Sequence, residues 1–179
     1  TTEDAEIADI VLPHELAEEV LSLFYECKEK IDIIRSPFGY TGDGKTRKRS
    51  ENEKPDESEI MDRAYVFIER YEKEKGPFIR LFSLKFRFIA VFGKKAEEPF
   101  IEMNKIIREI MVAANRLGDR YWKDQGRRKF TEQQFQQHLA EMENYEAIVW
   151  TGFENDELEK KVNKCIEKIE AYYLSIIKK

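Results

Sequence analysis

A glycine-rich stretch that leads into a basic cluster is the part of the sequence most suited to chemistry. The string from Gly39 to Thr46 satisfies the Gly-x4-Gly-Lys-Thr spacing of a loop that holds nucleotide phosphates with backbone N–H groups and a lysine. A true loop of this kind follows a buried strand and opens a helix, whereas this string follows an amphipathic helical pattern and leads into charged residues. The setting favours a flexible glycine loop, and we expect neither ATP nor GTP to bind.

The four basic residues of the same stretch are candidates for contact with a partner. They are Lys45, Arg47, Lys48 and Arg49. Phosphates, acidic lipids and acidic protein surfaces all attract such a cluster. Acidic residues at 51, 53, 56, 57 and 59 follow at once, and they largely neutralise the cluster beyond a Debye length of about 8 Å at physiological salt. A solvated loop is the simpler interpretation, and an interaction loop is the alternative.

The histidines and cysteines leave little scope for catalysis or metal binding. His138 and Glu141 stand one helical turn apart, but no second pair of ligands matches them, so a solvated helix face is the preferred interpretation. Cys27 and Cys165 fall on the apolar sides of predicted helices, where a thiol behaves as a small hydrophobic group. We expect both cysteines to be buried and reduced. We expect no catalytic residue, no metal site and no cofactor.

Composition and charge narrow the class of protein. With 179 residues, of which 41% are hydrophobic and 37% charged, the chain fits one globular domain with an ionised exterior. The net charge of −5 argues against a nucleic-acid partner, because such domains usually carry a basic excess. No run of 18 apolar residues is present to span a membrane. We expect a cytoplasmic domain, with any membrane anchor in a segment absent from this chain.

Apolar residues at steps of three and four predict the elements that position these groups. The expected helices cover about 13–35, 56–75, 78–92, 99–121, 131–150 and 156–176. Thr131 and Gln134 have the spacing of a capping box at the start of the fifth helix. Leu23, Phe24, Ile110 and Ile166 lie at the centres of their apolar stripes and are expected in the core. Residues 1–11 are expected to form a poorly ordered lead-in to a single domain at 12–179.

Two segments depart from this regular pattern. Residues 78–92 contain both an alternating strand pattern and a helical stripe, and we favour a helix because a lone strand would have no partner. The loop 36–55 is unusually long for a compact domain, and loops of this length are functional or disordered. We expect its tip at 41–52 to be mobile, because few apolar groups offset the cost of ordering it. Phe38 and Tyr40 are expected to dock on the bundle and hold its root.

Four short segments resemble a family of uncharacterised bacterial helical proteins. They read LPHELAEEVL at 12–21, IRSPF at 34–38, FIAVFG at 88–93 with EPF at 98–100, and IVWTG at 148–152. The resemblance spans most of residues 12–177. Members of this family often have a short N-terminal membrane anchor before the helical domain. The resemblance implies a cytosolic helical domain, and it implies no activity, ligand or catalytic residue.

The sequence therefore predicts an all-α, antiparallel bundle of about five or six helices with one long loop after the first helix. We expect a non-catalytic domain that mediates protein–protein interaction or self-association, as the cytosolic part of an anchored protein. The alternative is a ligand-binding or enzymatic bundle with a site between helices. Polar groups that converge in the interior would favour this alternative, and an apolar core with a projecting loop would favour the interaction domain.

Overall fold

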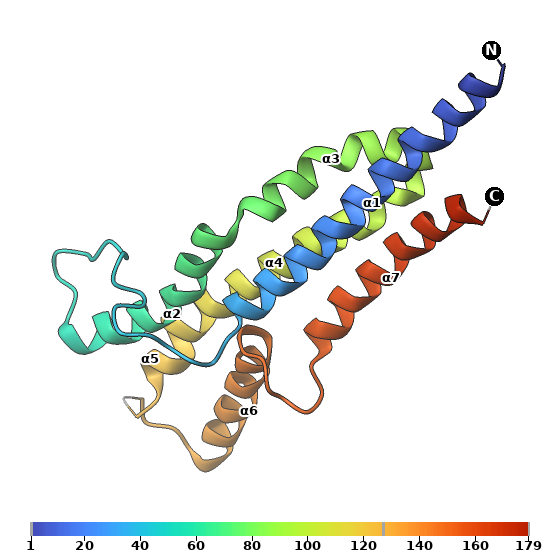
Figure 1. The fold of residues 1–179 in the computed structure, drawn as a ribbon. Coiled ribbons are helices and arrows are strands. Elements are labelled where there is room, and N and C mark those ends of the chain that lie inside the picture. Colours follow the sequence, from blue (N-terminus) through green and yellow to red (C-terminus); the bar gives the residue numbers. More distant parts are fainter. Residues whose placement is uncertain (1, 127, 179) are drawn as a thin grey trace. The chain divides into compact units, whose positions relative to one another are not determined.

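Helices make up most of the chain in the computed structural model, which describes residues 2–126 and 128–178, with side chains from residue 12 onward. The long helices are α1 (Thr2–Ile34), α2 (Pro55–Glu74), α3 (Gly76–Phe92), α4 (Glu98–Arg116), α6 (Glu132–Val149) and α7 (Glu157–Ile177) (Figure 1). Between them lie a 3₁₀ turn η1 (Lys94–Glu97), a π-helical turn η2 (Leu117–Tyr121) and the short α5 (Trp122–Asp124). The described residues contain no strand. The predicted all-α bundle is confirmed.

The helix ends follow the local sequence. Pro77 occupies the first turn of α3, where its missing N–H removes no helical hydrogen bond, and Gly93 ends the helix with a φ of 91°. The predicted helix over 78–92 is confirmed. At the start of α6, the hydroxyl of Thr131 accepts from the Gln134 N–H at 3.2 Å, and the Gln134 side chain accepts from the Thr131 N–H at 3.1 Å. The predicted capping box is confirmed.

The first helix is longer than the sequence pattern predicts. It begins at Thr2 rather than near Pro13, and Pro13 lies inside it. Poor order of residues 1–11 stays a prediction, and residue 1 lies outside the described residues. None of the helices over 2–126 and 128–178 has the length and apolar character needed to cross a membrane.

The helices pack as two compact units. The first combines Thr1–Lys30, Lys75–Ile106 and Leu158–Lys179, and the second combines Ile31–Glu74 and Ile107–Glu157. Helices α1 and α4 each contribute residues to both units. A single domain over residues 12–179 stays a prediction.

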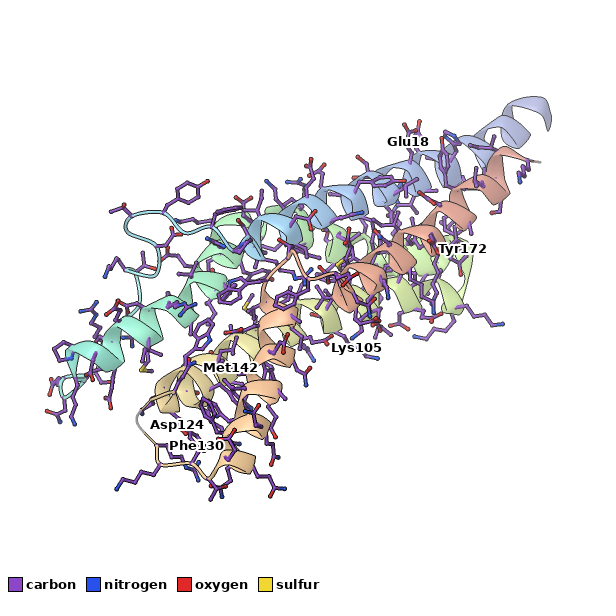
Figure 2. All side chains as sticks on the ribbon, turned by 90° about the horizontal axis from the view of Figure 1, so that it is seen from below. Glu18, Lys105, Asp124, Phe130, Met142 and Tyr172 are labelled. Atoms are coloured by element: carbon purple, nitrogen blue, oxygen red, sulfur yellow. The ribbon has the colours of Figure 1, made fainter. Side chains whose placement is uncertain are left out.

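Aromatic rings form the centre of the first unit. Phe100 lies 5.5 Å from both Phe24 and Phe88, measured between ring centroids, and Phe88 also packs 5.6 Å from Tyr172 of α7. Figure 2 labels Tyr172 on this helix. Helices α1 and α7 run antiparallel, because His14 packs against Tyr173 near one end while Lys28 donates to Asn163 further along. The four predicted core residues, Leu23, Phe24, Ile110 and Ile166, are all buried, as expected.

Both cysteines belong to this first unit. Cys27 and Cys165 are buried, and neither forms a disulfide, so the prediction of buried, reduced thiols is confirmed. Burial raises the pKa of Cys27 to about 12 and that of Cys165 to about 11. Such thiols stay protonated at neutral pH and are therefore poor nucleophiles.

A buried arginine organises the second unit. Arg35, just after the end of α1, is fully buried and forms a two-pronged ion pair with Asp156, at 2.9 and 3.0 Å. Its guanidinium also donates to three carbonyl oxygens at the end of α6, those of Ala147, Ile148 and Trp150. The last carbonyls of a helix lack partners within it, and Arg35 supplies partners here. In return, the Thr151 N–H donates to the Arg35 carbonyl at 3.0 Å.

We predict that Arg35→Met destabilises the protein by about 3–5 kcal/mol, because it removes the fully buried cation that pairs with Asp156 and donates to three carbonyl oxygens. Urea unfolding followed by circular dichroism measures the change. Arg116→Met is the matched control, since Arg116 is exposed on α4, and it should alter stability by no more than about 0.5 kcal/mol. Equal effects of the two substitutions would contradict the role of Arg35.

Candidate functional site

Helix α2 holds the loop 36–55 through a buried carboxylate. Glu69 accepts hydrogen bonds from the Gly44 N–H at 3.2 Å, the Thr46 N–H at 3.3 Å and the Thr46 hydroxyl at 2.5 Å. The backbone at Gly44 also runs directly against α2, since a Cβ added there would lie 2.1 Å from the Asp62 carbonyl oxygen. Only glycine fits at this position, because the φ of +78° is also unfavourable for other residues.

A second buried carboxylate of α2 holds the basic part of the loop. Asp62 accepts from Arg47 at 2.9 Å and from Arg49 at 2.6 Å. Arg47 also binds both oxygens of Glu53, at 2.9 and 2.7 Å, and the Ser58 hydroxyl donates to the same carboxylate. The guanidinium of Arg47 therefore links the middle of the loop to Asp62 of α2 and to Glu53, just before the start of α2.

These contacts overturn the reason for expecting a mobile tip at 41–52. That prediction assumed that nothing offsets the ordering cost, which is wrong, because the polar side chains of α2 supply acceptors for the loop.

The four candidate interaction residues of the loop differ in how exposed they are. The Arg47 side chain is only 11% exposed, whereas that of Lys45 is 63% exposed and lies 3.7 Å from Asp62. Lys48 and Arg49 are exposed, although Arg49 is paired with Asp62.

The root of the loop is fixed by Arg70 of α2. Its guanidinium donates to the carbonyls of Ser36 at 2.7 Å and Phe38 at 2.6 Å, and it lies 3.3 Å from the Asp43 carboxylate. Asp43 in turn accepts from the Tyr40 N–H at 2.9 Å. The predicted docking of the two aromatic side chains is wrong, because Phe38 is 76% and Tyr40 is 79% exposed. The backbone polar groups fix the root, and both rings face solvent.

The string at 39–46, which has the spacing of a nucleotide-binding loop, contacts a side chain of the protein itself. The N–H groups of Gly44 and Thr46, which would face phosphate in a nucleotide-binding loop, donate to Glu69 instead. The string follows helix α1, and α2 begins only at Pro55. A carboxylate of the protein itself thus takes the place that a phosphate would need. The absence of nucleotide binding stays a prediction.

A second group of polar residues lies beside the π-helical turn η2. Within the second unit, η2 packs closely on α2. A Cβ added at Gly118 would lie only 2.6 Å from the Cβ of Ala64, so a larger residue would not fit there without a shift. The same turn carries Tyr121, whose hydroxyl donates to Glu141 of α6 at 2.6 Å. Gln137 donates to the other oxygen of Glu141 at 2.9 Å. These two hydrogen bonds, that of Tyr121 foremost, lower the pKa of the Glu141 carboxyl group.

The predicted solvated face at His138 and Glu141 is wrong for the histidine. His138 is only 6% exposed, because its ring packs 4.8 Å from Phe130 and 5.3 Å from Tyr121. Figure 2 labels Phe130 on the connection between α5 and α6. The ring lines a cavity of about 180 Å³ beside the π-helical turn. Among the described residues, no cluster of three His, Cys, Asp or Glu side chains is arranged to hold a metal.

The sequence contained only weak signals for these residues. Asp62, Glu69 and Arg70 look like ordinary members of the polar face of an amphipathic helix. The π-helical turn continues the apolar spacing of α4, so periodicity does not reveal it. The available signal was Gly118 inside a helical pattern, since a glycine there indicates a close approach or a break in the helix.

Burial raises the pKa values of Asp62 and Glu69, but their hydrogen bonds lower them more, so both pKa values lie below the ordinary range. Such groups stabilise the fold above their unfolded pKa values, about 3.9 for Asp and 4.3 for Glu. That contribution is lost as the pH falls through the folded pKa. We therefore predict that the free energy of unfolding drops on acidification below about pH 4.

Urea titrations between neutral and acidic pH measure this drop. Asp62→Asn should cost about 1–3 kcal/mol at neutral pH and flatten the acid dependence. Glu59→Gln, which removes an exposed carboxylate from the same helix, is the control for loss of one negative charge. An Asp62→Asn protein with the acid dependence of the unaltered chain would contradict this assignment.

Comparison with known proteins adds no family to this description. No protein-family model, no curated protein and no solved structure matches the chain. The resemblance to bacterial helical proteins therefore stays an expectation. A function must be argued from the residues of the site, because a helical bundle by itself is compatible with many functions.

Proposed function

We propose that the chain is a non-catalytic protein-interaction domain and that the loop 36–55 presents its binding surface. Phe38 and Tyr40 are the anchors, and Lys45 and Lys48 are the charged residues beside them in the loop. The single observation that carries this proposal is the exposure of two aromatic side chains on a backbone that Arg70 and Asp43 hold in place.

Exposed aromatic side chains on a fixed backbone suit protein recognition. Aromatic residues are enriched at the centres of protein interfaces, where burial of their rings supplies much of the binding energy. A loop that is already ordered pays a smaller entropic cost on binding than a mobile one. The hydrogen bonds from Arg70 to the carbonyls of Ser36 and Phe38 provide this preorganisation.

The charges of the loop indicate the chemistry of the partner. Arg47 is neutralised by Glu53 and Asp62, so it contributes little to an outer surface. Lys45 and Lys48 are exposed, and Lys48 has no ion-pair partner among the described residues. A partner that offers an apolar pocket bordered by carboxylates would match the two rings and the two ammonium groups.

A cytoplasmic setting belongs to this proposal. Buried thiols that form no disulfide, as at Cys27 and Cys165, are typical of a reducing compartment. A membrane anchor in a segment outside this chain would place the same surface beside a membrane. The loop then faces protein partners in the cytosol, and any attraction of Lys45 and Lys48 to anionic lipid is a minor addition.

The proposal predicts specific crosslinking through the loop. We would produce the full chain in cells with a photoreactive p-benzoylphenylalanine in place of Tyr40. Irradiation should give a discrete adduct, either with another protein or with a second copy of the chain. Phe38→Ser should abolish this adduct while changing stability by less than about 0.5 kcal/mol, because Phe38 is exposed.

Phe86 provides the matched control. It is an exposed aromatic residue of α3 in the first unit, 73% exposed, and the same photoreactive group there should give no such adduct. Identical adducts from positions 40 and 86, or an adduct at position 40 that persists in Phe38→Ser, would contradict a specific surface at the loop.

A further inference from the structure

A polar cavity in the second unit has the features of a ligand site. It is a half-open cavity of about 180 Å³ between the π-helical turn η2, the connection that follows α5, and helix α6. The groups around it that matter here are Arg120, Arg128, Phe130, Gln137, His138 and Glu141. We propose that this cavity binds a small oxyanion, a phosphate or a carboxylate group, through the guanidinium groups of Arg120 and Arg128 together with His138.

The histidine supplies the first argument. His138 lines the cavity and is 94% buried, that is, 6% exposed. Its Nε2 is the one buried side-chain nitrogen or oxygen that has no hydrogen-bond partner among the described residues. Native proteins rarely leave such an atom unpaired, because desolvation without a partner is costly. An imidazole N–H at this position donates to an oxyanion with little rearrangement of the rings around it.

The arginines supply the second argument. The guanidinium carbon of Arg120 lies 5.4 Å from the centre of the Tyr121 ring, and that of Arg128 lies 5.5 Å from the centre of the Phe130 ring. A guanidinium held near the face of an aromatic ring by a cation–π contact still has N–H groups that can make a two-pronged contact with an oxyanion. Arg128 approaches only Asp124, at 3.9 Å, and Arg120 has no ion pair among the described residues.

One carboxylate, Glu141, also lines the cavity, and the nearby charge of Arg120 helps to lower its pKa. Glu141 is ionised, since its pKa is lowered, and both of its oxygens are engaged, one by Tyr121 and the other by Gln137. The cavity therefore presents two guanidinium groups and an unpaired imidazole nitrogen to whatever enters it. The two guanidinium charges exceed the single carboxylate charge, and this excess favours an anion.

The size of the cavity limits the ligand. Its volume is about 180 Å³. Pockets for drug-sized ligands have about 300–1,000 Å³. Inorganic phosphate or a short carboxylate fits this space, and the phosphate or carboxylate group of a larger molecule would enter it with the remainder outside.

Nuclear magnetic resonance of the imidazole rings tests the proposal in the full chain. The protein has two histidines, so ring-labelled histidine gives two sets of signals, which His138→Gln assigns. Inorganic phosphate is titrated at constant ionic strength against chloride. The His138 signals should shift saturably, and those of His14, in the first unit beside Tyr173, should not.

Three variants decide whether the site is the one proposed. Arg120→Gln and Arg128→Gln should each weaken phosphate binding by at least about tenfold, the effect of losing a charge-assisted hydrogen bond. Lys129→Gln removes a neighbouring exposed charge that does not line the cavity, and it should leave the affinity within about twofold. A parallel titration with acetate distinguishes a carboxylate ligand from a phosphate.

Either titration supports the proposal if it saturates at His138 and depends on both arginines. The proposal is overturned if neither anion shifts the His138 signals saturably, or if both histidines respond alike. It is also overturned if Lys129→Gln weakens binding as much as the two arginine variants. Crosslinking at the loop is measured independently, so this result and that for the proposed function can fail separately.

Discussion

Two buried carboxylates of helix α2, Asp62 and Glu69, are the constraint on which the conformation of the loop 36–55 depends. A buried carboxylate is costly unless hydrogen-bond donors surround it, and here the loop supplies those donors. The dependence is mutual, because the N–H groups of Gly44 and Thr46 and the guanidinium of Arg47 need acceptors as well. The loop therefore has a defined conformation without an apolar core of its own. Its aromatic side chains remain available for contact with a partner.

The helices could be predicted from the sequence, because their apolar residues recur with the period of a helix and their ends carry recognisable signals. Thr131 with Gln134 and Pro77 are examples, and the helix over 78–92 followed from the lack of a strand partner. The start of α1 at Thr2 was missed, because Pro13 is typical of the first turn of a helix, whereas here it lies inside one.

The candidate sites could not be predicted in the same way. An ion pair such as that of the buried Arg35 with Asp156 joins residues that are far apart in sequence, so no local sequence pattern predicts it. The glycine-rich string suggested phosphate binding, whereas Gly44 is required by its close approach to α2. Phe38 and Tyr40 were expected to pack on the bundle because aromatic residues are usually buried, but Arg70 fixes their backbone and leaves the rings in solvent.

Both candidate sites lie in the second unit, and helix α2 is common to their surroundings. One part of α2 holds the loop through Asp62, Glu69 and Arg70, and Ala64 packs against the π-helical turn that carries Arg120 and Tyr121. Polar groups thus converge at a half-open cavity, while two aromatic side chains of the loop are exposed. The interaction surface and the anion site are therefore separate proposals about different places in the same unit.

Hydrogen exchange of the loop amides tests the central claim most directly. If Glu69 holds the loop, the amides of Gly44 and Thr46 should exchange much more slowly than those of an unstructured chain, and Glu69→Gln should reduce their protection. The amide of Lys48, for which the structure provides no hydrogen bond, should exchange rapidly in both proteins and serves as an internal control. Exchange of the Gly44 and Thr46 amides at the rate of an unfolded peptide would contradict the account.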